Sequence, residues 1–433
     1  MKIILVILDG LGDRSYRELN YRTPLQAAET PNMNRLAQLG GNGLFHASLP
    51  GQCLPSETAH YLLFGYEMET FPGRGLLEAV GANINFNEKD ILSMAHLSSV
   101  STEKGIPILA GGRKSISLEP DQISQLYNCI SSYEIDEINF RLERTGFNDG
   151  ILVMSGEASP YVSDSDPMIV GRAMAMVKPL SANAEPEASH RTAKAINTYL
   201  AHCQRILSTH PVNKSLVEKD SPPANFLATQ RAGRRIVQQP FFDKWGLKGM
   251  MLSSGHIFAG LALELGMTLV RVEDGDDPGN DIRDRLDLAV NDTEHDFIHV
   301  HTKAPDEAAH RGDPAEKTRI ISSLDRGLDK LIKEVEERDD LIVAVTSDHS
   351  TPCVSNLIHS GEPVPVMIAG PNIRRDEVNA FDEIHSAAGC LGLLRGGELI
   401  STLLNCAERS SLIGHCLGES QRAYFPEDYE PFK

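Results

Sequence analysis

Short apolar runs alternate with amphipathic segments near both ends of the chain. Residues 3–8, 296–301 and 341–346 are rich in Ile, Val, Leu and Phe, which is typical of buried strands. Between the last two runs, Asp313 and Pro314 begin a predicted helix. Its apolar residues recur at helical spacing and comprise Ile320, Ile321, Leu324, Leu328, Leu331 and Val335. Strand, helix and strand in this order predict an α/β fold with a mainly parallel sheet flanked by helices.

The same alternation predicts how the chain divides into domains. Residues 78–182 have shorter apolar runs and more Ser, Asn and Glu. From about residue 185 the parallel-sheet pattern resumes, with helices near 192–207 and at 257–265 and strands at 249–252 and 268–272. We therefore predict a smaller α+β cap domain at 78–182, inserted between the two parts of the main domain at 1–77 and 183–433.

The chain is long and acidic. A chain of 433 residues is longer than a single hydrophobic core usually accommodates, which agrees with two domains. Hydrophobic residues at 41% and charged residues at 23% are typical of a soluble globular enzyme. A net charge of −19 disfavours nucleic acid as a partner and favours a small substrate. A phosphorylated substrate would then have to be held by local cations.

Two features bear on where the protein resides. The apolar run at 3–8 is too short for a secretory signal or a membrane span, so no membrane association is expected. The seven cysteines are scattered, odd in number and without a Cys-x-x-Cys pair. A reduced, cytoplasmic protein is the simplest account of both features.

Carboxylates and imidazoles follow the predicted strands. The carboxyl ends of parallel strands share one edge of a sheet, so groups placed there meet. His310 lies four residues after Asp306, and a helix would place both on one face. The adjacent Asp348 and His349 suit a loop whose side chains reach different ions. The sequence thus predicts a two-metal hydrolytic or transfer site, with ligands from Asp9, Asp306, His310, Asp348, His349 and His359.

Each candidate also has a simpler interpretation. Asp306 and His310 alone could be a surface pair, and only their combination with the other ligands favours metals. Ser56 precedes an apolar stretch and is predicted as a helix N-cap; beside a cation the same hydroxyl would be a nucleophile. Lys303, between a strand and the metal segment, either faces solvent or contacts phosphoryl oxygens. Core histidines are an equally simple interpretation of His60, His299 and His301.

Six motifs together carry a family resemblance. They are Val6-Ile-Leu-Asp-Gly-Leu-Gly, Thr23-Pro-Leu-Gln-Ala-Ala-Glu-Thr-Pro-Asn, Ser56-Glu-Thr-Ala-His, Gly73-Arg-Gly-Leu-Leu-Glu-Ala, Asp306-Glu-Ala-Ala-His and Ser347-Asp-His-Ser-Thr-Pro. With these motifs, nearly the whole chain resembles the archaeal-type cofactor-independent phosphoglycerate mutases of the alkaline phosphatase superfamily. The resemblance implies an alkaline phosphatase-like fold, and it is weakest in the cap region.

The resemblance also implies a chemistry. One divalent ion would be held by Asp306, His310 and His359, and a second by Asp9, Ser56, Asp348 and His349. Mn²⁺ is usual in the family, with Mg²⁺ or Zn²⁺ as substitutes. Ser56 would take the phosphoryl group from 3-phosphoglycerate and return it to the 2-hydroxyl, without 2,3-bisphosphoglycerate as a cofactor. Lys303 would hold phosphoryl oxygens or protonate the leaving alkoxide.

The substrate-binding arginines depart from the family pattern. A family stretch rich in Arg is reduced here to Ala110-Gly-Gly-Arg113. Bidentate arginines would bind the carboxylate and phosphate of the substrate, and the candidates are Arg74, Arg113, Arg231, Arg234 and Arg235. A metal-dependent phosphohydrolase, a small-molecule phosphotransferase and a non-catalytic binding protein of the same fold are the alternatives. The intact ligand set argues against the last of these.

Overall fold

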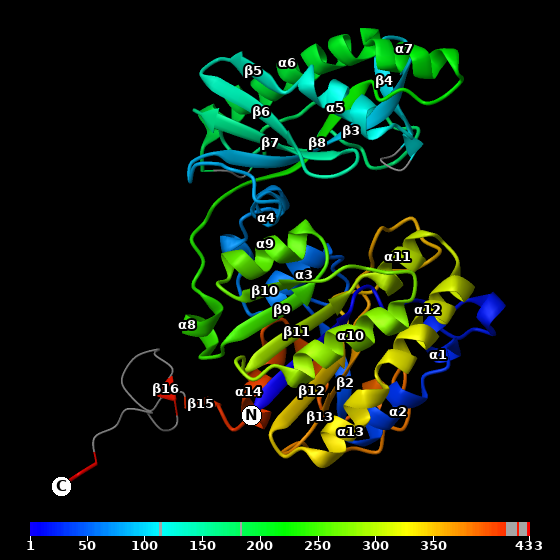
Figure 1. Ribbon diagram of the computed structural model, residues 1–433, viewed down its shortest axis with the longest axis vertical. Helices are drawn as coiled ribbons and strands as arrows, with labels where there is room; N and C mark the ends of the chain where they lie inside the picture. The colour runs from blue at the N-terminus through cyan, green and yellow to red at the C-terminus, as the bar shows by residue number, and fades with distance from the viewer. Residues whose placement is uncertain (112–114, 182–183, 413–421, 424–430) are drawn as a thin grey trace. The chain divides into compact units, whose positions relative to one another are not determined.

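An eight-stranded sheet organises the first of two units, and β1 (Lys2–Leu8) lies near its middle (Figure 1). The computed structural model describes residues 1–111, 115–181, 184–412, 422–423 and 431–433. The strand order is β10 (Thr268–Arg271), β9 (Gly249–Ser253), β11 (Phe297–Thr302), β1, β12 (Leu341–Thr346), β13 (Val364–Ala369), β2 (Gly40–His46) and β14 (Gly392–Arg395). Neighbouring strands are parallel except around β13, which is antiparallel to both β12 and β2. The predicted α/β fold with a mainly parallel sheet is confirmed.

Four helices pack on one face of this sheet. They are α2 (Pro31–Gln38), α10 (Pro278–Asn291), α12 (Pro314–Gly327) and α13 (Asp329–Glu337). Alternate residues of β1, such as Val6, share a buried apolar cluster with Leu286 of α10 and Leu324 of α12. Burial of this cluster holds the parallel strands in place. The long helix predicted after Asp313 is two helices, which meet at Leu328.

Shorter elements complete the first unit. Its other α-helices are α1 (Pro24–Ala27), α3 (Ser56–Leu63), α8 (Phe241–Trp245), α11 (Ala304–His310) and α14 (Glu398–Cys406). Among the described residues, short 3-10 helices occupy Arg17–Leu19, Met68–Thr70 and Ser386–Ala388, and β15 (Ser411–Leu412) pairs antiparallel with β16 (Arg422–Ala423). Of these elements, α3 and α11 carry residues of the site described below.

The second unit contains a separate antiparallel sheet. Its strands are β4 (Ile106–Gly111), β3 (Ile91–Glu103), β7 (Asp149–Gly156), β6 (Ile138–Arg144) and β5 (Ser132–Ile135), in this order, with β8 (Phe226–Arg234) also paired to β3. Its helices are α4 (Arg74–Gly81), α5 (Pro120–Asn128), α6 (Pro186–Thr209), α7 (Pro211–Glu218) and α9 (His256–Glu264). Tyr199 of α6 packs against Phe140 of β6 within a core of its own. This unit therefore has the α+β composition that was predicted for the cap.

The boundaries of the cap differ from those predicted. The second unit comprises Pro72–Gln238 and His256–Glu264, and the first comprises Met1–Phe71, Gln239–Gly255 and Leu265–Lys433. The predicted end at residue 182 is therefore too early. The apolar residues of α6 face the core of the second unit, and β8 pairs with β3 rather than with the parallel sheet. The hydrophobic pattern predicted no strand at 226–234, and periodicity alone does not assign a helix or a strand to one core or the other.

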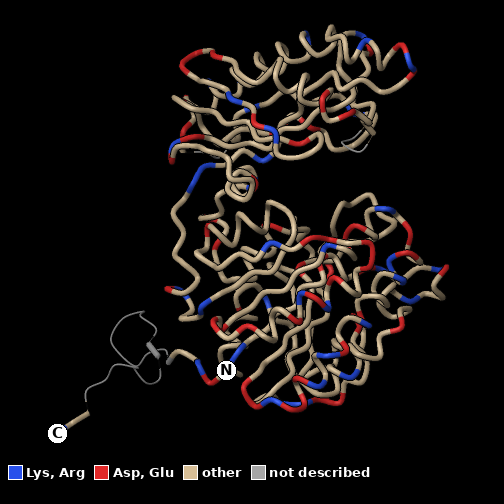
Figure 2. The backbone as a smooth tube through the Cα atoms, viewed as in Figure 1, with Lys and Arg blue, Asp and Glu red and all other residues tan. Residues whose placement is uncertain are grey.

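Charged residues and cysteines are distributed over both units. Asp and Glu together number 60 against 41 for Lys and Arg, and both signs occur in both units (Figure 2). Cys53, Cys129, Cys203, Cys353, Cys390 and Cys406 are free thiols, and Cys416 lies outside the described residues. Within the described part of the chain, none of the helices combines the length and apolar character that crossing a membrane requires.

Candidate metal centre

The carboxyl ends of β11, β1 and β12 bring distant segments of the chain together. β1 pairs in parallel with β11 on one side and with β12 on the other. Asp9 follows β1, α11 begins just after β11, and Asp348 lies two residues beyond β12. Gly10 turns the chain at a φ of 65°, and a Cβ there would lie 2.6 Å from Thr351 Oγ1 and 2.8 Å from Asp306 Cβ. Only glycine allows this close approach of the three loops.

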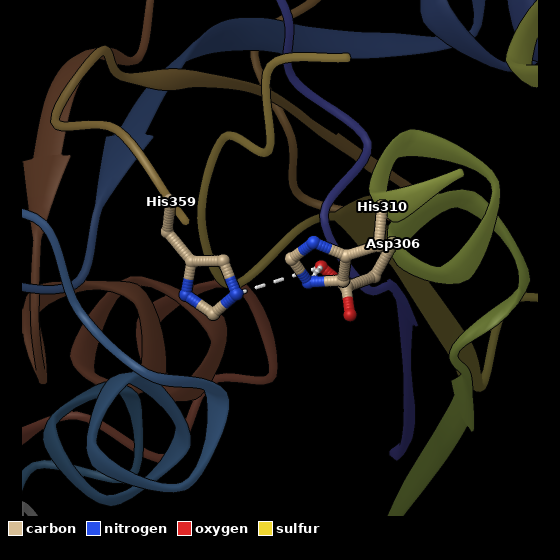
Figure 3. A group of neighbouring side chains, drawn as sticks. All are labelled: Asp306, His310 and His359. Carbon is tan, nitrogen blue, oxygen red and sulfur yellow. Dashed lines mark ion pairs between the residues drawn. The ribbon is translucent and has the colours of Figure 1, made fainter. Parts of the chain in front are cut away.

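Asp306, His310 and His359 form the first group of possible ligands (Figure 3). Asp306 Oδ1 lies 3.3 Å from His310 Nε2, one turn along α11, and 3.6 Å from His359 Nε2. The other ring nitrogen of His359, Nδ1, lies 2.7 Å from the carbonyl oxygen of Leu54. A carbonyl only accepts, so Nδ1 carries the proton and the Nε2 lone pair faces Asp306. One carboxylate oxygen and two imidazole nitrogens can hold one cation here.

A second group surrounds His349. Its Nε2 lies 3.4 Å from Asp9 Oδ1, 3.2 Å from Asp348 Oδ2 and 3.0 Å from Ser56 Oγ. The ligand atoms of Asp9, Asp306 and His349 all lie within 4.8 Å of one another. Asp306 thus borders both groups, which are contiguous. The structure brings together all seven residues that the family resemblance assigned to metals.

Ser56 occupies the first position of α3 rather than its cap. Pro55 is the N-cap residue, and no side chain caps this helix. The predicted N-cap role of Ser56 is therefore wrong. Its hydroxyl instead lies 3.4 Å from Asp9 Oδ1 as well as 3.0 Å from His349 Nε2. A helix amino end stabilises negative charge, so this position favours a serine oxygen that acts as a nucleophile.

Three buried carboxylates and several imidazoles share this small volume. Burial and the nearby Asp9 raise the pKa of Asp348 well above its usual value. Burial alone would also raise the pKa of Asp9, but the hydrogen bond from His301 and the charge of Lys303 hold this pKa well below its usual value. Burial lowers the pKa of His349 to about 3, so its imidazole is neutral at pH 7. Asp348 Oδ2 has no hydrogen-bond partner among the described residues. Concentrated carboxylates, neutral imidazoles and an unsatisfied buried oxygen fit divalent cations.

Known proteins are similar in sequence to nearly the whole chain. A family model described as the metalloenzyme superfamily matches residues 1–399. The 2,3-bisphosphoglycerate-independent phosphoglycerate mutase 2 of Methanocaldococcus jannaschii is 38% identical, over 99% of this chain and 99% of its own. The chain belongs to this mutase family, within the metalloenzyme superfamily. The family resemblance expected from the sequence motifs is thereby confirmed.

Two solved structures are similar along nearly the whole chain. A cofactor-independent phosphoglycerate mutase from Thermoplasma acidophilum has 30% identity and a TM-score of 0.59, covering 94% of this chain and 100% of that one. A protein from Pyrococcus horikoshii has 27% identity and a TM-score of 0.73, covering 95% of this chain and 99% of that one. Both structures therefore resemble the fold of this chain along nearly its whole length.

Lys303 lies directly beside the metal-site carboxylates. It occupies the N-cap position of α11 and is half-buried. Burial and the nearby Asp9 would raise the pKa of Asp306, but the His310 hydrogen bond, with a smaller contribution from Lys303, lowers it to about 2. The charge of Lys303 also helps to lower the pKa of Asp9. A cation at this position can contact an anionic substrate at the same sheet edge, and this role of Lys303 stays a prediction.

The predicted substrate-binding arginines lie in the other unit. Those that the structure describes belong to the second unit: Arg74, Arg231, Arg234 and Arg235. Arg113 lies outside the described residues. Three of the four form ion pairs within the second unit: Arg74 with Glu78, Arg234 with Glu185 and Arg235 with Glu264. Their assignment to the substrate stays a prediction.

A buried histidine and a buried lysine have roles that the sequence analysis did not predict. His301 Nε2 lies 3.1 Å from Asp9 Oδ2 and so orients the ligand carboxylate. The available signal was strand alternation, which turns the side chains of His301 and of Ile7, its partner on β1, to the same face of the sheet. Lys317 of α12 is fully buried and donates to Gly12 O, Asp13 Oδ2 and Thr351 O. It ties the loop after β1 to the loop after β12, a contact with no local sequence signal.

Proposed function

We propose that this protein interconverts 3-phosphoglycerate and 2-phosphoglycerate through a phosphoserine formed on Ser56, without 2,3-bisphosphoglycerate. The observation that carries the proposal is the position of the Ser56 hydroxyl, 3.0 Å from His349 Nε2 and 3.4 Å from Asp9 Oδ1 at a helix amino end. Full-length similarity to a relative named as such a mutase supports it. A cytoplasmic location follows the same proposal and is supported by the free thiols.

Two divalent cations would complete this centre, with Mn²⁺ as the expected ion. Asp306, His310 and His359 would hold one, and Asp9, Ser56, Asp348 and His349 the other. The oxygen and imidazole donors suit a borderline cation such as Mn²⁺. When bound, the cations would lower the pKa of the serine hydroxyl and neutralise the phosphoryl oxygens.

The protein groups divide the reaction into two balanced halves. In the first, Ser56 Oγ, which would have released its proton to solvent when the cations bound, bonds to phosphorus as the bond to O3 breaks, while Lys303 protonates the leaving alkoxide. The glycerate then turns within the site. In the second half, its 2-hydroxyl gives a proton back to Lys303 and attacks the phosphoserine. The bond from phosphorus to Ser56 Oγ breaks, Ser56 leaves as the alkoxide with which it began, and no phosphate is released, provided that water is excluded.

A coupled assay separates this function from its closest alternative. The protein with Mn²⁺ and 3-phosphoglycerate should form 2-phosphoglycerate, detected as phosphoenolpyruvate by added enolase. A parallel assay should find inorganic phosphate at well under one release per turnover. Release at the rate of substrate loss would replace the proposal with a phosphohydrolase, and turnover of neither kind would refute it.

Because Asp306 borders both ligand groups, its substitution should affect both ions. The wild-type chain is expected to bind two Mn²⁺ ions. The Asp306→Asn variant should lose tight binding of both, whereas His310→Asn should lose one, since His310 belongs to the first group only. Equilibrium binding followed by the electron paramagnetic resonance of free Mn²⁺ measures the stoichiometry.

A second Asp–His pair provides the control. Asp382 Oδ2 and His385 Nδ1 lie 2.6 Å apart in the same unit, outside both ligand groups. The His385→Asn variant should bind both ions as the wild type does. An Asp306→Asn variant with unchanged Mn²⁺ stoichiometry and affinity would contradict the assignment.

A further inference from the structure

The Thr351 hydroxyl joins the two ligand groups. Thr351 is fully buried in the loop after β12. Its Oγ1 lies 2.9 Å from Asp306 Oδ1 and 3.1 Å from His349 Nδ1. Asp306 borders both ligand groups and His349 belongs to the second. One hydroxyl therefore contacts a principal ligand of each candidate ion.

The direction of these hydrogen bonds follows from the atoms involved. A ligand carboxylate only accepts, so Thr351 must give its single hydroxyl proton to Asp306. The hydroxyl oxygen then accepts from His349, and the proton of that imidazole is on Nδ1. The Nε2 lone pair is left facing Asp9 Oδ1 at 3.4 Å and Asp348 Oδ2 at 3.2 Å. His359 has the same arrangement, since its Nδ1 donates to the carbonyl of Leu54.

The position of the hydroxyl is itself fixed by the backbone. The Thr351 N–H donates to the carbonyl of Gly12 at 2.9 Å, and the Thr351 carbonyl accepts from Lys317 Nζ at 2.8 Å. Gly10 leaves the space that Oγ1 occupies, since a Cβ there would lie 2.6 Å from it. Two separate segments, the loop after β1 and helix α12, thus hold this side chain between Asp306 and His349.

We propose that Thr351 is a positioning residue, which sets the tautomer of His349 and the orientation of Asp306 so that both present lone pairs to the metal ions. This inference rests on the proposed function, because it requires a metal centre. A residue that hydrogen-bonds to a metal ligand and orients it typically contributes about 10-fold to 100-fold to metal affinity or activity. Without the hydroxyl, the proton of His349 can shift to Nε2, which removes the lone pair that faces the ions.

The decisive comparison is between Thr351→Val and Thr351→Ser. Valine keeps the shape and removes the hydroxyl, whereas serine keeps the hydroxyl. Thr351→Val should weaken Mn²⁺ binding by roughly 10-fold to 100-fold and lower kcat with little change in the KM for 3-phosphoglycerate. Thr351→Ser should restore both. Thr346→Val is the matched control, because the buried Thr346 hydroxyl donates to the carbonyl of Pro365 at 2.9 Å and contacts no proposed ligand.

Three results would overturn the proposal. They are wild-type Mn²⁺ affinity in Thr351→Val, no rescue in Thr351→Ser, and an equal loss in Thr346→Val. The Mn²⁺ titration needs no turnover, so it tests the role of Thr351 independently of the mutase activity. A wild-type protein that binds two ions but forms no 2-phosphoglycerate would refute the mutase activity, while the binding data for the variants would still decide the role of Thr351.

Discussion

Replacing Ser56 with alanine should abolish phosphoryl transfer. The substitution removes the oxygen that accepts the phosphoryl group, and loss of a covalent nucleophile lowers kcat by ~10³-fold or more. The helix should persist, because Ser56 makes no capping hydrogen bond in α3 and alanine is favourable in helices. The coupled assay measures the loss, and metal analysis should still find bound Mn²⁺ on Asp9, Asp348 and His349.

A buried hydroxyl elsewhere in the unit supplies the control. Ser386 is fully buried, and its Oγ has no hydrogen-bond partner among the described residues. Ser386→Ala should therefore turn over at the wild-type rate. If Ser56→Ala with intact metal retained near-normal kcat, the phosphoserine mechanism would be wrong.

Replacing Lys317 with methionine should destabilise the first unit by about 3–5 kcal/mol. Both Lys317 and its partner Asp13 have fully buried side chains, 3.0 Å apart from Nζ to Oδ2. Methionine fills the space but leaves the buried Asp13 charge without its cationic partner and the Thr351 carbonyl without the lysine donor. The only tryptophan, Trp245, lies in the first unit and donates to the carbonyl of Phe64 at 2.9 Å. Its fluorescence during urea unfolding reports on this unit.

An exposed lysine provides the comparison. Lys330 pairs with Asp287 at 2.6 Å, with 54% and 40% of the side chains exposed. Exposed pairs contribute about 0–1 kcal/mol, so Lys330→Met should change the unfolding midpoint little. Equal midpoints for the Lys317 and Lys330 variants, both measured with chelator present, would show that the buried pair does not hold the two loops.

Much of the fold was predictable because its central strands are short and buried. The apolar runs at 3–8, 296–301 and 341–346 correspond to β1, β11 and β12, since strands covered on both faces contain little but apolar residues. Asp306 and His310 were also predictable, because their spacing of four is a property of the helix itself. Both features are local in the sequence.

Features that depend on a distant partner were not predictable. No strand was predicted at 226–234, where β8 forms, and only the tertiary structure places β8 beside β3. The hydroxyl of Ser56 is typical of a helix N-cap residue, but Pro55 is the N-cap residue of α3. Thr351 and Lys317 matter through contacts with residues about 30 to 300 positions away. Sequence periodicity contains no information about such contacts.

The most direct test follows the phosphoryl group itself. The protein with Mn²⁺ is mixed with 3-phosphoglycerate that carries ³²P, quenched in acid during turnover, and analysed for labelled peptide, labelled 2-phosphoglycerate and labelled phosphate. We expect transient label on the peptide containing Ser56 and full recovery of the remaining label in the two phosphoglycerates. Label that accumulates as inorganic phosphate, or 2-phosphoglycerate that forms without labelled Ser56, would contradict transfer through this serine.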